Sequence, residues 1–169
     1  MMIRDAMLED SPHLANIYNF YVTNSCATFE ETPVSNEDMS TRLTKVSNAN
    51  LPWIVAVKNG AVIGYAYATK WKERTAYRFS VESTIYLDND AQGEGVGTRL
   101  YEVLLSRLKS LGINNVIGGI TLPNPASIAL HEKLGMKKVA HFSNVGFKFD
   151  KWLDVGYWQL SLRTEAVTE

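Results

Sequence analysis

Apolar residues in the N-terminal third of the chain recur at helical spacing. From about Ser11, apolar positions three and four residues apart predict a helix, and Pro12 suits its first position. The apolar face of this helix consists of Leu14, Ile17, Tyr18 and Tyr21. Ser35, with Asp38 three positions later, resembles a capping box and predicts a second, more polar helix that ends near Val46.

The middle of the chain changes to strand-like patterns. Asn59-Gly60 separates two β-prone runs and is a strong signal for a tight hairpin. A further β-prone run leads into a cluster of glycines, and a short strand is predicted near the N-terminus. The strands predicted in this part of the chain cover residues 3–6, 53–58, 62–69 and 79–87.

A long amphipathic helix follows the glycine cluster, and Gly112 ends it. Its apolar face consists of Val96, Leu100, Val103, Leu104, Leu108 and Leu111. The remaining predicted elements are a strand, a helix and two strands, over residues 115–120, 125–134, 139–145 and 157–162. The order β-α-α-β-β-β-α-β-α-β-β predicts a mixed α/β (α+β) fold and not a repeating βαβ series. With no linker or internal repeat, we expect one domain over residues 1–169, with a flexible tail over about 163–169.

Composition limits the classes of partner. The formal net charge is -1, so the chain has no global attraction for nucleic acid or an anionic membrane, and neither is expected as a partner. No apolar run approaches membrane-spanning length, and residues 1–5 contain no apolar h-region, so no secretory signal is expected. Cys26 is the only cysteine, which excludes an intrachain disulfide and favours a reducing, cytoplasmic location. No metal site is expected.

Three glycines, Gly93, Gly95 and Gly97, lie between a predicted strand and the long helix. Free N–H groups and the helix dipole make such a helix start an anion site suited to phosphate. No Gly-Lys-Ser/Thr follows, which excludes a Walker A loop. The G-x-G-x-G spacing, with Asn114 and Asn115 where an acidic residue belongs, disfavours a dinucleotide fingerprint. A plain strand-to-helix turn remains the alternative.

Two motifs in this order resemble those of the GNAT superfamily of N-acetyltransferases. The segment Gln92-Gly93-Glu94-Gly95-Val96-Gly97 matches the Q/R-x-x-G-x-G/A signature, and residues 124–136 resemble N-x-x-S/A-x-x-x-Y-x-x-x-G-F. The resemblance extends from residue 3 to about 162. The chain is most similar to the phosphinothricin / methionine sulfoximine acetyltransferase group, and the segments that carry this similarity are residues 52–56, 64–68, 71–77, 81–86 and 152–160.

The resemblance implies a GNAT fold, a mixed and mostly antiparallel sheet flanked by about four helices. It implies acetyl-CoA as cosubstrate and, as acceptor, the α-amine of L-phosphinothricin, methionine sulfoximine or methionine sulfone. Members of the group are typically homodimers, so a homodimer is expected. The residues expected to bind acetyl-CoA are Ile85, Tyr86, Leu87, Gln92, Gly93, Glu94, Gly95, Val96, Gly97, Thr98, Asn124 and Ser127.

Acetyl transfer to an amine needs a base, because an α-amine is largely ammonium near neutral pH. Glu82 is the candidate: it lies within a β-prone run, and the group's motif has its catalytic glutamate at this position. A salt bridge or an exposed acid is the alternative. His131 stands where many superfamily members have a tyrosine that protonates the departing thiolate, and histidine can donate a proton near neutrality. The alternative is a helix-surface histidine bonded to a neighbour.

The acceptor site is expected from the connection between two predicted strands. Its candidates Arg74, Thr75, Ala76 and Tyr77 offer a cation, backbone amides and an aromatic wall, although a solvated loop explains them equally well. By resemblance, Phe29, Glu30 and Lys148 are further candidates. The aromatic segment over residues 147–152 is an alternative dimer contact.

Two alternative functions remain open at this level. The chain could acetylate another small amine, a polyamine or a protein N-terminus, although it has no acidic run that would attract a polyamine. It could also be a non-catalytic acyl-CoA-binding module. The position of Glu82 argues against the second alternative, because a binder needs no base there.

Overall fold

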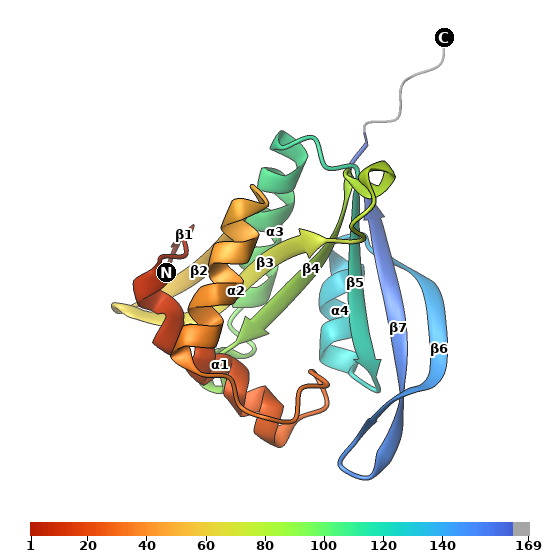
Figure 1. The fold of residues 1–169 in the computed structure, drawn as a ribbon, viewed down its shortest axis with the longest axis horizontal. Helices are drawn as coiled ribbons and strands as arrows, with labels where there is room; N and C mark the ends of the chain where they lie inside the picture. The colour runs from red at the N-terminus through yellow and green to blue at the C-terminus, as the bar shows by residue number, and fades with distance from the viewer. Residues whose placement is uncertain (164–169) are drawn as a thin grey trace.

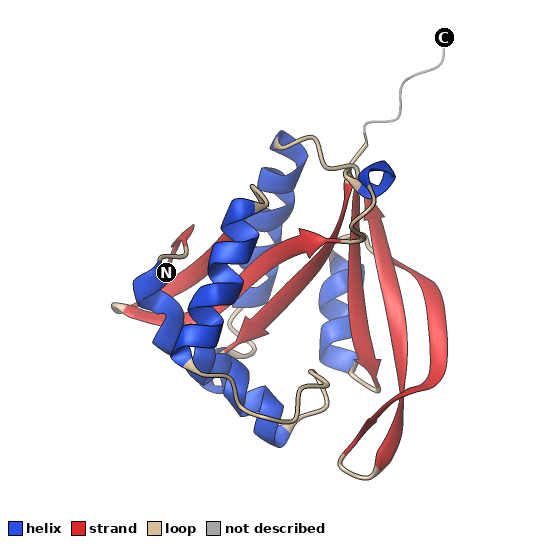
Figure 2. Ribbon diagram, viewed as in Figure 1, coloured by secondary structure: helices blue, strands red, loops and turns tan. Residues whose placement is uncertain are grey.

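In the computed structural model, which describes residues 1–163, a central sheet lies between two layers of helices (Figures 1 and 2). The tail predicted over residues 163–169 lies, apart from Arg163, outside the described residues. The strands are β1 (Met2–Asp5), β2 (Trp53–Lys58), β3 (Ala61–Lys70), β4 (Ser80–Leu87), β5 (Asn115–Leu122), β6 (Lys137–Lys148) and β7 (Lys151–Ser161). The helices are α1 (Ser11–Asn24), α2 (Asn36–Asn48), α3 (Val96–Ser110) and α4 (Pro125–Lys133), with short 3-10 turns η1 (Leu8–Asp10), η2 (Thr75–Tyr77) and η3 (Asn89–Ala91).

The sheet has the strand order β1-β2-β3-β4-β5-β7-β6. All neighbouring strands are antiparallel except β4 and β5, which run parallel. These two strands pair only where Ser80, Val81 and Glu82 face residues 115–117. Beyond Glu82 they diverge toward their carboxyl ends, as the gap between β4 and β5 in Figure 1 illustrates. This divergence opens the sheet where a ligand could enter between its two halves.

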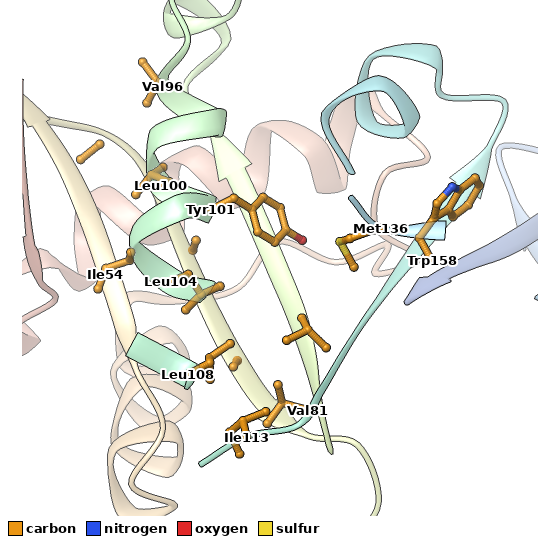
Figure 3. Packing of buried hydrophobic residues seen from close by; sticks show 14 of the residues in the cluster. Ile54, Val81, Val96, Leu100, Tyr101, Leu104, Leu108, Ile113, Met136 and Trp158 are labelled. Carbon is orange, nitrogen blue, oxygen red and sulfur yellow. The ribbon is translucent and has the colours of Figure 1, made fainter. Parts of the chain in front are cut away.

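Alternate residues of the central strands point into two separate cores. On β2, Trp53 and Val55 pack against α1 and α2, whereas Ile54 and Ala56 pack against α3 on the opposite face. Figure 3 shows the second core, in which the apolar side of α3 lies against β4. Because a strand repeats every two residues, hydrophobic residues at all four positions are what a sheet covered on both faces requires.

The predicted order of elements and the mixed α/β fold are confirmed. Most boundaries differ by only a few residues, but β6 and β7 are longer than predicted and meet in a tight turn at Phe149 and Asp150. Both turn residues have positive φ values, 52° and 57°. A phenylalanine at positive φ gives no sequence signal for a hairpin turn, which explains why the first six residues of β7 were missed. No helix within residues 1–163 is long and apolar enough to cross a membrane.

Candidate active site

A cleft of about 900 Å³ lies where β4 and β5 diverge, and it brings together residues from both halves of the chain. One end is formed by the glycine loop and α4, and the other by Glu82, Phe29 and Tyr157. Of the predicted acetyl-CoA ligands, all line the cleft except Glu94. Within the described part of the chain, no cluster of three histidine, cysteine or acidic residues has the geometry of a metal site.

The glycine loop ends at the first turn of α3. Gly95 is the N-cap residue of this helix and has a φ of 75°, in the left-handed region that favours glycine. Gly97 permits close packing, because a Cβ there would lie 3.2 Å from Leu130 of α4. Together they expose the first N–H groups of α3 to the cleft, as a phosphate site requires.

Side-chain hydrogen bonds connect this loop to its neighbours in the fold. Gln92 donates a hydrogen bond to the Tyr21 hydroxyl over 3.2 Å, and that hydroxyl donates to the carbonyl of Leu87 over 2.5 Å. The loop is therefore tied to α1 and to the end of β4. Glu94 points away from the cleft and pairs with Lys58, with 2.7 Å between Nζ and Oε2. The carboxylate of Glu94 thus has a structural partner outside the candidate site.

Helix α4 begins beside the same end of the cleft. The side-chain oxygen of Asn124 accepts a hydrogen bond from the backbone N–H of Ser127 over 3.1 Å, which caps the helix. Pro125 occupies the first helical position, where its missing N–H costs nothing. Both Asn124 and Ser127 line the cleft, together with Lys133 farther along α4.

Glu82 lies at the last residue of the β4–β5 pairing, where the two strands separate. Its carboxylate lines the cleft near Gly119 of β5 and is partly buried. Loss of hydration raises the pKa of Glu82, and the positive charge of Lys72 partly opposes this change. A raised pKa brings a carboxylate closer to the range in which it can exchange protons near neutral pH.

His131 is a buried residue with only 3% of its surface exposed, so the alternative of a helix-surface histidine is wrong. Its Nδ1 lies 2.7 Å from the carbonyl oxygen of Ser127, and its Nε2 lies 2.9 Å from the hydroxyl of Tyr101. Burial lowers the pKa of His131, while the contact with Ser127 works in the opposite direction. Both ring nitrogens therefore have protein partners.

The segment after α1 forms the wall of the cleft opposite α4. Ser25, Thr28 and Phe29 line the cleft, but Lys148 and Glu30 do not. Instead, the buried Nζ of Lys148 donates hydrogen bonds to the carbonyls of Ser25 and Thr28, over 2.7 and 2.8 Å. Burial lowers the pKa of Lys148, and nearby acidic groups oppose that change. Lys148 thus holds the wall in place from behind.

Glu30 belongs to a polar cluster beneath this wall. It accepts hydrogen bonds from both terminal nitrogens of Arg42, over 2.8 and 2.5 Å, and one from the hydroxyl of Tyr18. These contacts use both of its carboxylate oxygens. In this structure Glu30 is a partner of α1 and α2, and it does not lie at the cleft surface.

The structure does not bring the four predicted residues of the β3–β4 connection into the cleft. Arg74 precedes η2, and Thr75, Ala76 and Tyr77 form that exposed turn. The connection starts close to the site, since Trp71 packs edge-on against Tyr157, with 5.8 Å between their ring centroids. The four residues therefore lie beyond the acceptor end of the cleft and not on its lining.

Several cleft residues were missed by sequence reasoning. Tyr101 was not among the positions singled out on α3, and Tyr157 was counted only as a strand residue. Tyr21 was assigned to the apolar face of α1, although its hydroxyl supports the glycine loop. Lys133 is the only cation that lines the described cleft. Contacts between distant segments reveal these roles: Tyr21 and Tyr101 lie outside the two family motifs, and Lys133 and Tyr157 lie in family-like segments at positions to which no role was assigned.

The split sheet and its cleft are those of an acetyltransferase. The chain is similar to the structure described as a GNAT superfamily phosphinothricin acetyltransferase from Sinorhizobium meliloti in complex with AcCoA, with a TM-score of 0.94. The two are 40% identical, and the match covers 99% of this chain and 91% of that one. Residues 3–156 also match the family described as acetyltransferase (GNAT) domain. The chain belongs to the GNAT acetyltransferase family, as its two motifs predicted.

Curated relatives lie within the same group. The chain is 36% identical to phosphinothricin N-acetyltransferase of Alcaligenes faecalis over 99% of its own length and 84% of that protein. It is 35% identical to L-methionine sulfoximine/L-methionine sulfone acetyltransferase of Pseudomonas paraeruginosa (strain DSM 24068 / PA7), over 95% of this chain and 94% of that protein. The resemblance seen in the sequence is therefore confirmed at the level of the family and its group.

Proposed function

We propose that this enzyme transfers the acetyl group of acetyl-CoA to the α-amine of a small amino-acid-like acceptor. The acceptor class is that of L-phosphinothricin, methionine sulfoximine and methionine sulfone, named for relatives that match nearly the whole chain. The observation that carries the proposal is the position of Glu82, the only carboxylate that lines the cleft within residues 1–163. It lies on β4, which leads directly into the glycine loop.

Glu82 is the proposed general base. The Glu82 carboxylate accepts a proton from the acceptor ammonium, directly or through water, and the neutral amine then attacks the thioester carbonyl. As the C–S bond breaks, the nitrogen loses its second proton to the departing sulfur, which releases the free CoA thiol. The raised pKa of Glu82 makes it a better proton acceptor than an exposed carboxylate would be. A non-catalytic acyl-CoA-binding module would gain nothing from a partly buried carboxylate at this point.

The opposite end of the cleft is the proposed acetyl-CoA site. Backbone N–H groups at residues 93–98 would bind the pyrophosphate, which suits a chain without a strong positive charge. Lys133, Asn124 and Ser127 of α4 line the same end and offer a cation and polar groups. The backbone of Ile85, Tyr86 and Leu87 is proposed to bind the acyl arm, because these residues line the cleft between Glu82 and the loop.

Phe29 is the proposed aromatic contact for the acceptor side chain, because it lines the cleft at the Glu82 end. The β3–β4 connection beyond Trp71 is proposed to contact the acceptor at the outer rim of the cleft, through Arg74, Thr75, Ala76 and Tyr77. Glu30 and Lys148 are proposed to act indirectly, since their charged groups bind the protein behind the cleft wall.

The proposed reaction is tested by release of free CoA thiol from acetyl-CoA. Methionine sulfone, methionine sulfoximine and phosphinothricin are compared with spermidine and a peptide panel at equal concentration. We expect turnover with the three amino-acid-like acceptors and little with the others. Turnover only with spermidine or peptides would change the acceptor class. Measurable acetyl-CoA binding without turnover of any acceptor would refute the enzyme function.

A homodimer in the cytoplasm is the proposed state of the enzyme. The β6–β7 hairpin exposes four large aromatic side chains, and such a patch is typical of an interface. These residues are Phe142, Phe147, Phe149 and Trp152, with 50–67% of their surfaces exposed. Light scattering after size-exclusion chromatography should give the mass of two chains, and Trp152→Lys should shift it toward one. A monomeric wild type at micromolar concentration would refute the proposal.

A further inference from the structure

A continuous row of hydrogen bonds crosses the buried interior between β4 and α4. The hydroxyls of Ser83 and Tyr101 lie 2.8 Å apart, and the Tyr101 hydroxyl lies 2.9 Å from Nε2 of His131. The other ring nitrogen of His131, Nδ1, lies 2.7 Å from the carbonyl oxygen of Ser127. Tyr101 is fully buried and projects from α3 across the core toward Met136 (Figure 3).

The carbonyl of Ser127 at one end fixes the direction of every bond in this row. A carbonyl oxygen only accepts, so Nδ1 of His131 must carry the hydrogen that it donates to Ser127. In the neutral ring Nε2 is then an acceptor, and the Tyr101 hydroxyl donates to it. The Tyr101 oxygen has used its only hydrogen, so the hydroxyl of Ser83 donates to Tyr101.

The other two states of the ring fit this site poorly. The opposite neutral tautomer would place the lone pair of Nδ1 against the Ser127 carbonyl oxygen, at 2.7 Å. The imidazolium form would place a charge in a site that is 97% shielded from solvent, and burial lowers the pKa of His131 accordingly. Tyr101, whose pKa burial raises, contacts the ring directly, and the charge of Glu82 on β4 acts on Tyr101. Glu132 and Lys133 follow His131 on α4 itself.

We infer that Tyr101 is a positioning residue that holds His131 in its neutral Nδ1–H tautomer, with Ser83 fixing Tyr101 in turn. This inference rests on the proposed acetyl transfer and deepens its residue assignment. His131 then presents no ring N–H toward the cleft in its resting state. The place of His131 in the motif suggested that it donates a proton to the departing thiolate. A neutral Nδ1–H ring bonded in this way does not fill that role. The ring instead joins α4 to α3 and, through Tyr101, to the strand that carries Glu82.

The lack of space around the ring supports a fixed orientation. A Cβ added at Gly118 of β5 would lie 2.9 Å from both Nε2 and Cδ2 of His131, so only glycine leaves room for the ring there. The imidazole is therefore confined between β5 on one side and Tyr101 on the other. A side chain that is packed and bonded at both nitrogens is suited to defining a position rather than to moving protons.

Nitrogen NMR of histidine-labelled protein tests the tautomer without any assay of turnover. The chain has three histidines, and His131 is assigned by its loss in His131→Gln. His141 is an internal control with the opposite pattern, because its Nε2 contacts the Asp154 carboxylate and its Nδ1 accepts from Lys138. We expect His131 to be a neutral Nδ1–H ring at pH 7. An Nε2–H ring or an imidazolium at pH 7 would overturn the inference.

Removing the hydroxyl of Tyr101 tests the positioning role. Tyr101→Phe deletes the bond that stabilises the neutral ring, so the pKa of His131 should rise and the kcat profile should gain an ionisation absent from wild type. We expect kcat/KM for acetyl-CoA to fall about tenfold, because the ring no longer fixes α4 against α3 at the acetyl-CoA end of the cleft. Tyr65→Phe, which removes the hydroxyl of a buried tyrosine on the opposite face of the sheet, should change neither.

Ser83→Ala keeps the test decisive if Tyr101→Phe does not fold. It removes only the donor to Tyr101, so the same changes should appear with smaller size. Unchanged His131 titration and an unchanged kcat profile in the folded variant would refute the positioning role. An inactive wild type that still has the Nδ1–H tautomer would refute the proposed acetyl transfer but leave the tautomer assignment intact.

Discussion

Glu82→Gln removes the only carboxylate that lines the cleft within residues 1–163, with almost no change of shape. The amide of glutamine is almost the same size as the carboxylate and still forms hydrogen bonds, but it cannot accept the proton of an amine. It therefore tests the proposed base separately from packing on β4. The same change also removes a charge from a partly buried position, so activity and stability should change in opposite directions.

The expected size of the kinetic effect follows from the lack of another base in the described cleft that could replace Glu82. No other carboxylate lines the described cleft, and both ring nitrogens of His131 are already bonded. The variant should therefore lose much of the benefit of general base catalysis, and we expect kcat to fall by at least ~10². This fall corresponds to about 2.7 kcal/mol in the activation free energy.

The pH dependence gives a second measurement. In wild type, kcat/KM for the acceptor should rise with pH as Glu82 ionises, through a pKa above the ordinary range of a glutamate. Thiol release with a saturating concentration of acetyl-CoA measures this profile. The lower limb should be absent in Glu82→Gln, whereas the limb that belongs to the acceptor amine should remain. A near-normal rate at all pH values would refute the assignment of Glu82 as base.

The stability of the same variant tests the cause of the pKa shift. A carboxyl whose folded-state pKa is raised stabilises the protein below its unfolded pKa, and this contribution is lost as pH rises through the folded pKa. At neutral pH the ionised Glu82 is therefore unfavourable. Glu82→Gln should raise Tm at pH 7, and the difference should shrink on acidification. A lower Tm at pH 7 would mean that the carboxylate is stabilised by a partner.

Three further substitutions, the first with a matched control, test the glycine loop, the cleft wall and the cap of α4. Gly95→Val forces a β-branched residue to a φ of 75°, which costs ~1–3 kcal/mol of backbone strain. Because this strain distorts the loop, the Kd for acetyl-CoA measured by calorimetry should rise about tenfold. Gly60→Val, at a φ of 80° in the β2–β3 hairpin, is the matched control that should lose stability but keep its Kd. Lys148→Met removes two charge-assisted hydrogen bonds to the cleft wall. The KM for the acceptor should therefore rise about tenfold, whereas the Kd for acetyl-CoA should not change. Equal effects on the two constants would contradict a local role of Lys148. Asn124→Ala removes the cap of α4 and should lower the free energy of unfolding in urea by about 1 kcal/mol, and an unchanged value would show that the bond to Ser127 contributes little.

Local patterns were sufficient to predict the elements and their order. The apolar run that starts at Trp53 reflects burial on two faces, the Asn59-Gly60 turn reflects positive φ, and the glycines before α3 reflect positive φ and close approach. Such requirements depend on neighbours in sequence, so they can be recognised in a single chain. The β6–β7 turn is the exception, because Phe149 adopts a positive φ that its residue type does not indicate.

The sequence by itself determined the glycine loop, the place of Glu82 on the strand before it, and the family to which the chain belongs. Only the tertiary structure decided which of the remaining candidates lie in the cleft. Lys148 and Glu30 were expected at the acceptor by resemblance to the group, but contacts with segments up to 123 residues away bind them to the protein. Tyr101 carried no sequence signal for a role in the site, yet its hydroxyl lies within hydrogen-bond distance of Ser83 and His131. Hydrogen bonds depend on the direction and spacing of atoms from distant segments, and the linear order of residues does not contain that information.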